Sequence, residues 1–321
     1  MSFDVERVRD DFTVLKRTWQ RSPIVYFDSA ATTLKPKPVV EAVVRYLEHS
    51  SGNIHRGNHL LSEEASTAFE DARSAVARFW STTADSIVFV RGTTEAIQTV
   101  AAGFDLAPDD NVVGTILEHH SNILPWSSRC HYRAVPLDGE GLPDLSRAAE
   151  LIDAKTRIVT VTMCSNVTGV HVPIGDWVKL AHDRGLPILV DAAQVCAHLA
   201  LDLTELDVDF LATSGHKMCG PTGAGVLYGK PERLEQLRVV NPGGGAVSLV
   251  RDDFTYDLRE GPLRFESGTP DIASVIGLGA AVEYLAGVGM EAIAKHNADL
   301  ARYLYRELAQ VTGIEMVHAV S

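Results

Sequence analysis

The stretch Arg157-Ile-Val-Thr-Val-Thr-Met163 decides the fold class of this chain. Its run of β-branched residues predicts a buried strand. A segment with helical apolar spacing follows at residues 175–184, and a second apolar run comes at residues 188–190. A strand, a helix and another strand in this order form the unit from which parallel sheets are built. Further units of the same kind are therefore expected on both sides of it.

Strand and helix patterns continue to alternate along the chain. Strands are expected at residues 87–90, 111–116, 133–137, 209–213 and 223–228, and helices at residues 94–102, 144–155 and 276–308. Because the strand runs are apolar on both faces, they predict an α/β fold with a mostly parallel sheet covered by helices on both sides. Ligands bind such sheets at the carboxyl ends of the strands, so functional residues are expected in the loops that follow them.

Composition restricts the possible functions further. The chain has 321 residues, of which 45% are hydrophobic and 22% charged, and its net charge is −13. These values are typical of a globular protein of about two domains, and the absence of a basic run disfavours nucleic acid and membrane surfaces as partners. No secretory signal, membrane span or CxxC pair is present in the sequence, so we expect a soluble, reduced, cytoplasmic protein.

One polar loop, Arg91-Gly-Thr-Thr-Glu95, lies where the expected strand 87–90 turns into a helix. Free backbone N–H groups and the positive end of the helix dipole favour a phosphate at such a position. An ordinary helix cap with a Thr-Thr-Glu capping box is the alternative. The chain has neither a Walker loop nor a GxGxxG motif, which disfavours a nicotinamide oxidoreductase.

Two charged residues follow neighbouring strands. Asp191 comes directly after Leu189-Val190, where a carboxylate is costly unless it meets a positive partner. The protonated pyridine nitrogen of pyridoxal 5′-phosphate is such a partner, although an Asp can also cap the next helix. Lys217 ends the stretch Ser214-Gly-His-Lys217, where a Schiff-base lysine or an ordinary loop lysine would both fit. The interval between the two residues allows them to come from adjacent strand ends.

Three more loops carry side chains of this kind. An imidazole in Glu118-His-His-Ser-Asn122 could stack on a planar ring, and the amide in Ser165-Asn-Val-Thr-Gly169 could bind a ring hydroxyl or a carboxylate. Both loops also fit ordinary turns. His55-Arg-Gly-Asn-His59 has HxxxH spacing, but the glycines around it disfavour a helix, so we expect no metal site. Taken together, the loops predict a pocket for pyridoxal 5′-phosphate.

These motifs resemble the class V aminotransferase family of fold-type I enzymes, and in particular the group II (SUF-type) cysteine desulfurases and selenocysteine lyases. The resemblance extends from about residue 24 to about residue 310. It rests on the four loops described above, on the Asp191 and Lys217 motifs, and on two further stretches, Tyr26-Phe-Asp-Ser-Ala-Ala31 and Arg264-Phe-Glu-Ser-Gly-Thr-Pro270. It implies a large domain with a mostly parallel mixed sheet, followed by a small α/β domain.

The resemblance also implies roles for individual residues. Lys217 would form the Schiff base with pyridoxal 5′-phosphate, and His119 would stack on the ring and act with Lys217 as a catalytic residue. The expected cofactor-binding residues are Thr93, Thr94, His119, Asn166, Asp191, Gln194, Ser214, His216, Lys217 and, from the second subunit of a homodimer, Thr269. The expected substrate-binding residues are Ala30, Ala31, His55, Arg56 and Asn166.

The implied reaction converts L-cysteine to L-alanine and passes the sulfur on as a persulfide, which would place the enzyme in sulfur metabolism, for example in iron–sulfur cluster assembly with a sulfur-acceptor protein. The alternatives are a selenocysteine lyase, a C–S lyase or an aminotransferase, and a pyridoxal phosphate-binding sulfur-relay protein without turnover.

Three regions are expected along the chain: an N-terminal arm at residues 1–22, the cofactor domain at residues 23–285, and the start of a small C-terminal domain at residues 286–321. The family's nucleophilic Cys and carboxylate-binding Arg would follow Ser321, so we expect either a truncated small domain or a protein that has lost this half of the site; a strand is expected at residues 313–320. The four cysteines present are expected to be small buried residues and not nucleophiles; they are Cys130, Cys164, Cys196 and Cys219.

Overall fold

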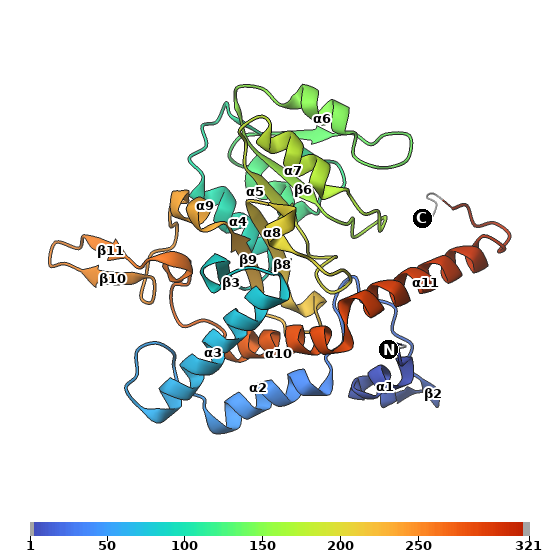
Figure 1. Ribbon diagram of the computed structural model, residues 1–321, viewed down its shortest axis with the longest axis horizontal. Coiled ribbons are helices and arrows are strands. Elements are labelled where there is room, and N and C mark those ends of the chain that lie inside the picture. Colours follow the sequence, from blue (N-terminus) through green and yellow to red (C-terminus); the bar gives the residue numbers. More distant parts are fainter. Residues whose placement is uncertain (1–2, 317–321) are drawn as a thin grey trace.

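The computed structural model describes residues 3–316 and has a seven-stranded sheet at its centre (Figure 1). The strands run in the order β3-β9-β8-β7-β6-β4-β5. Their bounds are β3 Ile87–Val90, β4 Asn111–Thr115, β5 His131–Val135, β6 Thr156–Thr162, β7 Ile188–Asp191, β8 Phe210–Ser214 and β9 Gly225–Gly229. Strands β4 to β8 pair in parallel, and β9 runs antiparallel to both β8 and β3. The expected mostly parallel sheet is confirmed.

Neighbouring residues of each strand pack into different hydrophobic cores. Ile188 and Val190 of β7 belong to one core, whereas Leu189 between them belongs to the other. Successive side chains of a strand point to opposite faces, so both faces of the sheet are covered. This explains why central strands such as β7 carry apolar residues at successive positions.

Eleven α-helices surround the sheet within residues 3–316. Their bounds are α1 Val5–Asp10, α2 Lys37–His49, α3 Leu60–Phe79, α4 Thr93–Gly103, α5 Leu124–Ser127, α6 Leu145–Leu151, α7 Ile174–His182, α8 Leu203–Leu206, α9 Pro231–Gln236, α10 Ile272–Val288 and α11 Met290–Leu308. One core packs the sheet against α3, α7 and α10, and the other packs it against α4 and α5. Helix α10 also packs along α2 and α3.

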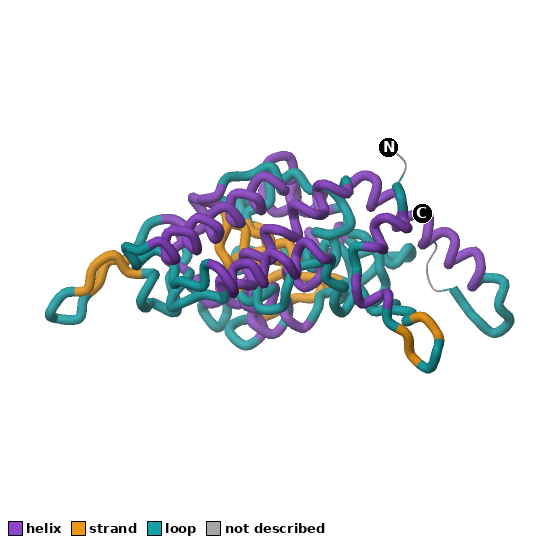
Figure 2. Tube along the Cα trace, turned by 90° about the horizontal axis from the view of Figure 1, so that it is seen from below, coloured by secondary structure: helices purple, strands orange, loops and turns teal. Residues whose placement is uncertain are grey.

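Two hairpins and one helix extend from this body. The hairpins are β1 Thr18–Trp19 with β2 Ser22–Pro23, and β10 Val247–Val250 with β11 Tyr256–Leu258 (Figure 2). Helix α11 has no buried residue and leads away from the sheet (Figure 1). The strand expected at residues 313–320 is absent from residues 313–316, and its remaining residues lie outside the described part of the chain.

No single helix within residues 3–316 is long and apolar enough to cross a membrane, and α10 and α11 meet that criterion only as a pair bent by 76°.

Candidate cofactor and active site

The carboxyl ends of β7 and β8 bring the two charged residues predicted from the sequence to the same edge of the sheet. Asp191 is the last residue of β7 and pairs with Ala212 of β8. Strand β8 ends at Ser214, and the 3₁₀ turn Gly215–Lys217 follows at once. Because both strands point the same way, their loops leave the sheet side by side. The sheet therefore places Asp191, Ser214 and Lys217 in one region.

Asp191 is buried and incompletely paired. Its side chain accepts a hydrogen bond from the N–H of Ala193 at 3.0 Å, and its other carboxylate oxygen has no hydrogen-bond partner among the described residues. Burial raises the pKa of Asp191, and the Ala193 N–H together with the nearby charges of Lys217 and His119 opposes that rise. A buried carboxylate in this state is suited to a cationic ligand group.

Lys217 is half-buried in the turn after β8. Burial lowers the pKa of its amine from the usual 10.5, and the charge of Asp191 opposes this effect. A lysine with a lowered pKa has a larger fraction of neutral, nucleophilic amine near neutral pH.

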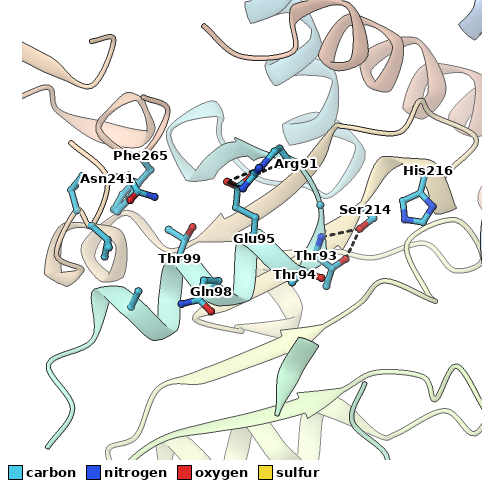
Figure 3. Close-up of a pocket in the computed structure, with 14 residues that line it drawn as sticks. Arg91, Thr93, Thr94, Glu95, Gln98, Thr99, Ser214, His216, Asn241 and Phe265 are labelled. Atoms are coloured by element: carbon cyan, nitrogen blue, oxygen red, sulfur yellow. Dashed lines mark hydrogen bonds and ion pairs between the residues drawn. The ribbon is translucent and has the colours of Figure 1, made fainter. Parts of the chain in front are cut away.

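The hydroxyl-rich loop predicted to bind a phosphate lies next to this turn. Thr93, the first residue of α4, donates its N–H to Ser214 Oγ at 2.8 Å, and the two hydroxyls are 2.7 Å apart. A side chain at Gly92 would approach Ser214 Oγ to 3.1 Å, so glycine leaves this space open. A cavity of about 700 Å³ is lined by Thr93, Thr94, Ser214 and His216 (Figure 3).

Ser121 connects residues 91–95, the loop predicted to bind the phosphate, to His119, the histidine expected to stack on the ring. Its hydroxyl lies 2.7 Å from Thr94 Oγ1 and 3.0 Å from His119 Nδ1, and its N–H donates to His119 Nδ1 at 3.1 Å. Since Nδ1 accepts that bond, a neutral His119 carries its proton on Nε2. Sequence reasoning quoted Ser121 as part of a motif but gave it no role, because the bond to Thr94 joins residues of different loops.

Glu118, directly before His119, fastens the same loop to the sheet. Its carboxylate accepts hydrogen bonds from the Thr162 N–H at 2.8 Å, from Thr115 Oγ1 at 2.7 Å and from Asn122 Nδ2 at 2.6 Å. Burial raises the pKa of Glu118 to about 8, and these hydrogen bonds oppose the rise. Glu118 is a second residue of the site that sequence reasoning left without a role, because the contact with Thr162 at the end of β6 depends on the tertiary fold.

Part of the expected substrate side also meets this region. Gln194, three residues after Asp191, donates from Nε2 to the carbonyl of Ala30 at 3.0 Å. Ala30 and Ala31 are exposed in the loop before α2, and Asn166 is exposed in the loop after β6. Tyr26 Oη donates to the Thr32 carbonyl at 2.5 Å and thereby closes the turn that contains both alanines.

His55, Arg56 and Thr269 do not line the cavity beside Thr94. They line a separate cavity of about 150 Å³, which shares no residue with the cavity beside Thr94. His55 Nε2 lies 3.4 Å from Glu70 Oε1, and His59 caps α3 by accepting the Ser62 N–H at its Nδ1. The two histidines of the HxxxH motif therefore have different structural neighbours.

The residues at the ends of β3, β7 and β8 fit pyridoxal 5′-phosphate chemically. The buried and partly unpaired Asp191 matches the pyridine nitrogen, and the Lys217 amine matches the aldehyde carbon. The N-terminus of the 11-residue helix α4, with Thr93 and Ser214 beside it, matches the phosphate.

Comparison with known proteins gives the following matches. The "Aminotransferase class-V" family model matches residues 25–321. A cysteine desulfurase of Enterobacter sp. is 41% identical over 325 residues, which cover 98% of this chain and 80% of the relative. The apo cysteine desulfurase of Thermococcus onnurineus matches with a TM-score of 0.89 and 36% identity, over 97% of this chain and 78% of that one. The cysteine desulfurase CsdA of Escherichia coli matches with a TM-score of 0.88 and 37% identity, over 98% of this chain and 79% of that one.

Proposed function

The chain belongs to the aminotransferase class V family, in which it is a pyridoxal phosphate-dependent enzyme of the cysteine desulfurase type, and we propose that Lys217 and Asp191 are the centre of its active site. Its reaction converts L-cysteine to L-alanine and transfers the sulfur atom to a thiol, which becomes a persulfide. The observation that carries the proposal is the position of Asp191 and Lys217 at the ends of adjacent parallel strands.

Each residue of the site has a task in this proposal. Pyridoxal 5′-phosphate supplies an electron sink for the negative charge that remains when the substrate loses its α-proton. Asp191 keeps the ring nitrogen protonated, and Thr93, Thr94, Ser214 and His216 hold the phosphate. Gln194 binds the ring hydroxyl, and Asn166 orients the ring or the substrate.

Lys217 and His119, the two expected catalytic residues, transfer protons in this proposal. Lys217 Nζ takes the α-proton and returns it, because its lowered pKa increases the fraction of neutral amine that can accept a proton. His119 would stack on the cofactor ring, and its Nε2 proton would be available for donation because Nδ1 is engaged by Ser121.

The four cysteines within the described residues are unsuited to receive the sulfur. Burial raises the pKa of Cys164 and Cys219 to about 11 and that of Cys196 to about 12, and it also raises the pKa of Cys130. Each is thus a protonated thiol at neutral pH, whereas the nucleophile in persulfide formation is the thiolate. We propose that the sulfur leaves on a thiol other than these four, such as that of an acceptor protein.

A homodimer would complete the site. We propose that Thr269, His55 and Arg56 face the cofactor of the partner subunit, which is supported by their cavity being separate from the one beside Thr94 in their own chain. We also assign the enzyme to the group II (SUF-type) subgroup, to the cytoplasm and to sulfur metabolism such as iron–sulfur cluster assembly. These assignments are supported by the motifs and by the composition.

Alanine formation tests the proposed function. Purified protein with pyridoxal 5′-phosphate is given L-cysteine, with and without a thiol reductant, and alanine is quantified beside a Lys217→Ala variant. We expect alanine from the wild type only, at a rate that rises with the reductant because the reductant removes the sulfur. Alanine at equal rates from both proteins, or from neither, would refute the proposal.

A variant with all four cysteines replaced by Ser separates the alternatives. If the sulfur leaves on another thiol, this variant keeps its rate of alanine formation in the presence of reductant. Loss of that activity in a folded variant would place the acceptor thiol among the four cysteines. Turnover of selenocysteine or cystine in the absence of any alanine from L-cysteine would favour a lyase.

A further inference from the structure

The turn that carries Lys217 does not itself hold the peptide group before the lysine. Within the turn Gly215–Lys217, the carbonyl of Gly215 accepts the N–H groups of Met218 at 2.8 Å and of Gly220 at 2.9 Å. These bonds fix the start of the turn but leave the carbonyl of His216, the residue before Lys217, without a partner inside the turn. A lysine that must meet one atom of a ligand needs a fixed backbone.

A distant segment supplies the missing bonds. The His216 carbonyl accepts the Thr33 N–H at 2.9 Å, the Thr33 hydroxyl at 2.9 Å, the Thr32 hydroxyl at 3.1 Å and Lys35 Nζ at 3.2 Å. All four donors come from residues 32–35, in the loop before α2. A carbonyl oxygen has two lone pairs, so the four donors share them, and the loss of one donor leaves others in place.

Thr33 also holds the chain on the other side of Lys217. Its hydroxyl accepts the Cys219 N–H at 2.8 Å while it donates to the His216 carbonyl. Cys219 has φ +61°, a left-handed conformation that is unfavourable for a residue other than glycine and persists only where surrounding contacts impose it. One hydroxyl thus joins the peptide group before the lysine to the peptide group two residues after it.

Lys35 is placed in the same cluster at an energetic cost. It is half-buried, and its ammonium also contacts the Thr33 carbonyl and, at 3.4 Å, the Thr32 hydroxyl. No carboxylate within residues 3–316 forms an ion pair with it, so its charge is compensated by neutral oxygens alone. Burial lowers the pKa of Lys35, and Cys219 opposes that effect. A lysine with no other task would leave its ammonium in water.

We propose that Thr33 and Lys35 are positioning residues, which set the direction of the Lys217 side chain by fixing the peptide groups on both sides of it. This inference rests on the proposed role of Lys217 as the residue that bears the cofactor. It adds that residues 32–35 are needed for this role, through their hydrogen bonds to the backbone of His216 and Cys219.

Four variants of the full chain test the inference. Thr33→Val removes the hydroxyl while keeping the shape, and Lys35→Met removes the charge. Thr33→Ser restores a hydroxyl, and Lys37→Met is the matched control, since Lys37 is an exposed lysine of α2 that pairs with Glu41. The cofactor is removed, pyridoxal 5′-phosphate is added back, and the rise of the visible absorption band is followed in time. Visible circular dichroism per bound cofactor is then compared, and thermal unfolding serves as the measure of folding.

We expect Thr33→Val and Lys35→Met to slow attachment about tenfold and to reduce the visible circular dichroism about twofold, because the lysine samples more directions. Thr33→Ser and Lys37→Met should match the wild type, and all variants should unfold cooperatively. Wild-type attachment and dichroism in both Thr33→Val and Lys35→Met would overturn the positioning role. If the wild type lacks the visible band, or if the band survives in Lys217→Ala, then the proposed role of Lys217 is itself wrong. This result differs from failure of the positioning role alone, in which the band depends on Lys217 but not on Thr33 or Lys35.

Discussion

At the scale of single residues, Asp191 has the surroundings that say most about the chemistry. A buried carboxylate with one backbone hydrogen bond would be unfavourable in a protein that offered it no positive partner. The charges of Lys217 and His119 compensate it in part. The ring nitrogen of the cofactor would complete the compensation, which explains why an acidic residue stands at the end of an otherwise apolar strand.

The charge of Asp191 gives a prediction on pH dependence. Lys217 can attack an aldehyde only when deprotonated, so the rate of cofactor attachment should rise with pH and level off near the lowered pKa of Lys217, below 10.5. Asp191 raises that pKa, so an Asp191→Asn variant should reach its plateau at a lower pH. Stopped-flow absorbance at a series of pH values measures both curves.

The same variant should lose most of its turnover. Asn cannot keep the ring nitrogen protonated, so we expect alanine formation to fall at least about a hundredfold. An attachment curve that does not move, together with wild-type turnover, would show that Asp191 is a helix-capping residue without a role at the ring.

At the scale of elements, an ion pair fastens the Arg264-to-Pro270 motif to the sheet. The Arg73 guanidinium of α3 donates to both carboxylate oxygens of Glu266, at 2.7 and 2.9 Å, and the Phe89 N–H of β3 donates to Glu266 at 2.7 Å. Both side chains are at most 5% exposed. This contact fixes the loop that carries Thr269 relative to the strand that leads to the phosphate loop.

Removal of one partner should therefore be costly. We expect Glu266→Ala to lower the free energy of unfolding by about 3 kcal/mol, because the buried guanidinium keeps only Glu70 as a carboxylate partner and the Phe89 N–H loses its acceptor. As a control, Asp183→Ala breaks an exposed ion pair with Lys179 and should cost less than about 0.5 kcal/mol. Urea denaturation measures both values, and equal losses in the two variants would contradict the importance of the buried pair.

The sequence predicts the parallel core of the sheet well, since each β-branched run marks one strand. It does not predict that β9 enters between β8 and β3, because the order of strands depends on contacts that no local pattern records. The hairpins β1–β2 and β10–β11 are missed for another reason: their strands are short and mostly exposed, so they carry no apolar periodicity.

The site shows the same limit. Asp191 and Lys217 stand out in the sequence because a strand end is a recognisable place for a functional residue. The hydrogen bond from the Thr33 hydroxyl to the His216 carbonyl joins residues 183 positions apart, and nothing near Thr33 in the sequence indicates it.

At the scale of the whole molecule, the proposed homodimer assigns the two cavities of one chain to different active sites. The proposed dimer assigns Lys217 and Thr269 of one chain to different active sites. A closed two-fold dimer would then contain two equivalent sites, each built from both chains. The regions proposed along the chain are an arm at residues 1–22, a cofactor domain at residues 23–285 and the start of a small domain at residues 286–321. The lack of buried residues in α11 supports a separate unit beginning near its start.

Subunit complementation tests this arrangement. Lys217→Ala and Thr269→Val homodimers should each form little alanine, since every site lacks one residue. Random mixing of the two chains makes half of the dimers mixed, and each mixed dimer has one intact site, so about a quarter of the wild-type activity should return. No recovery in mixtures that native mass spectrometry shows to contain mixed dimers would mean that Lys217 and Thr269 serve the same site.

The most direct measurement on the central proposal is the location of the cofactor's covalent bond. The wild type is incubated with pyridoxal 5′-phosphate, reduced with borohydride and digested, and the peptides are analysed by mass spectrometry. The account predicts one modified peptide, with the added mass on Lys217, and no modification at Lys35 or at the exposed Lys37. A modification spread over several surface lysines, or absent from Lys217, would contradict the account.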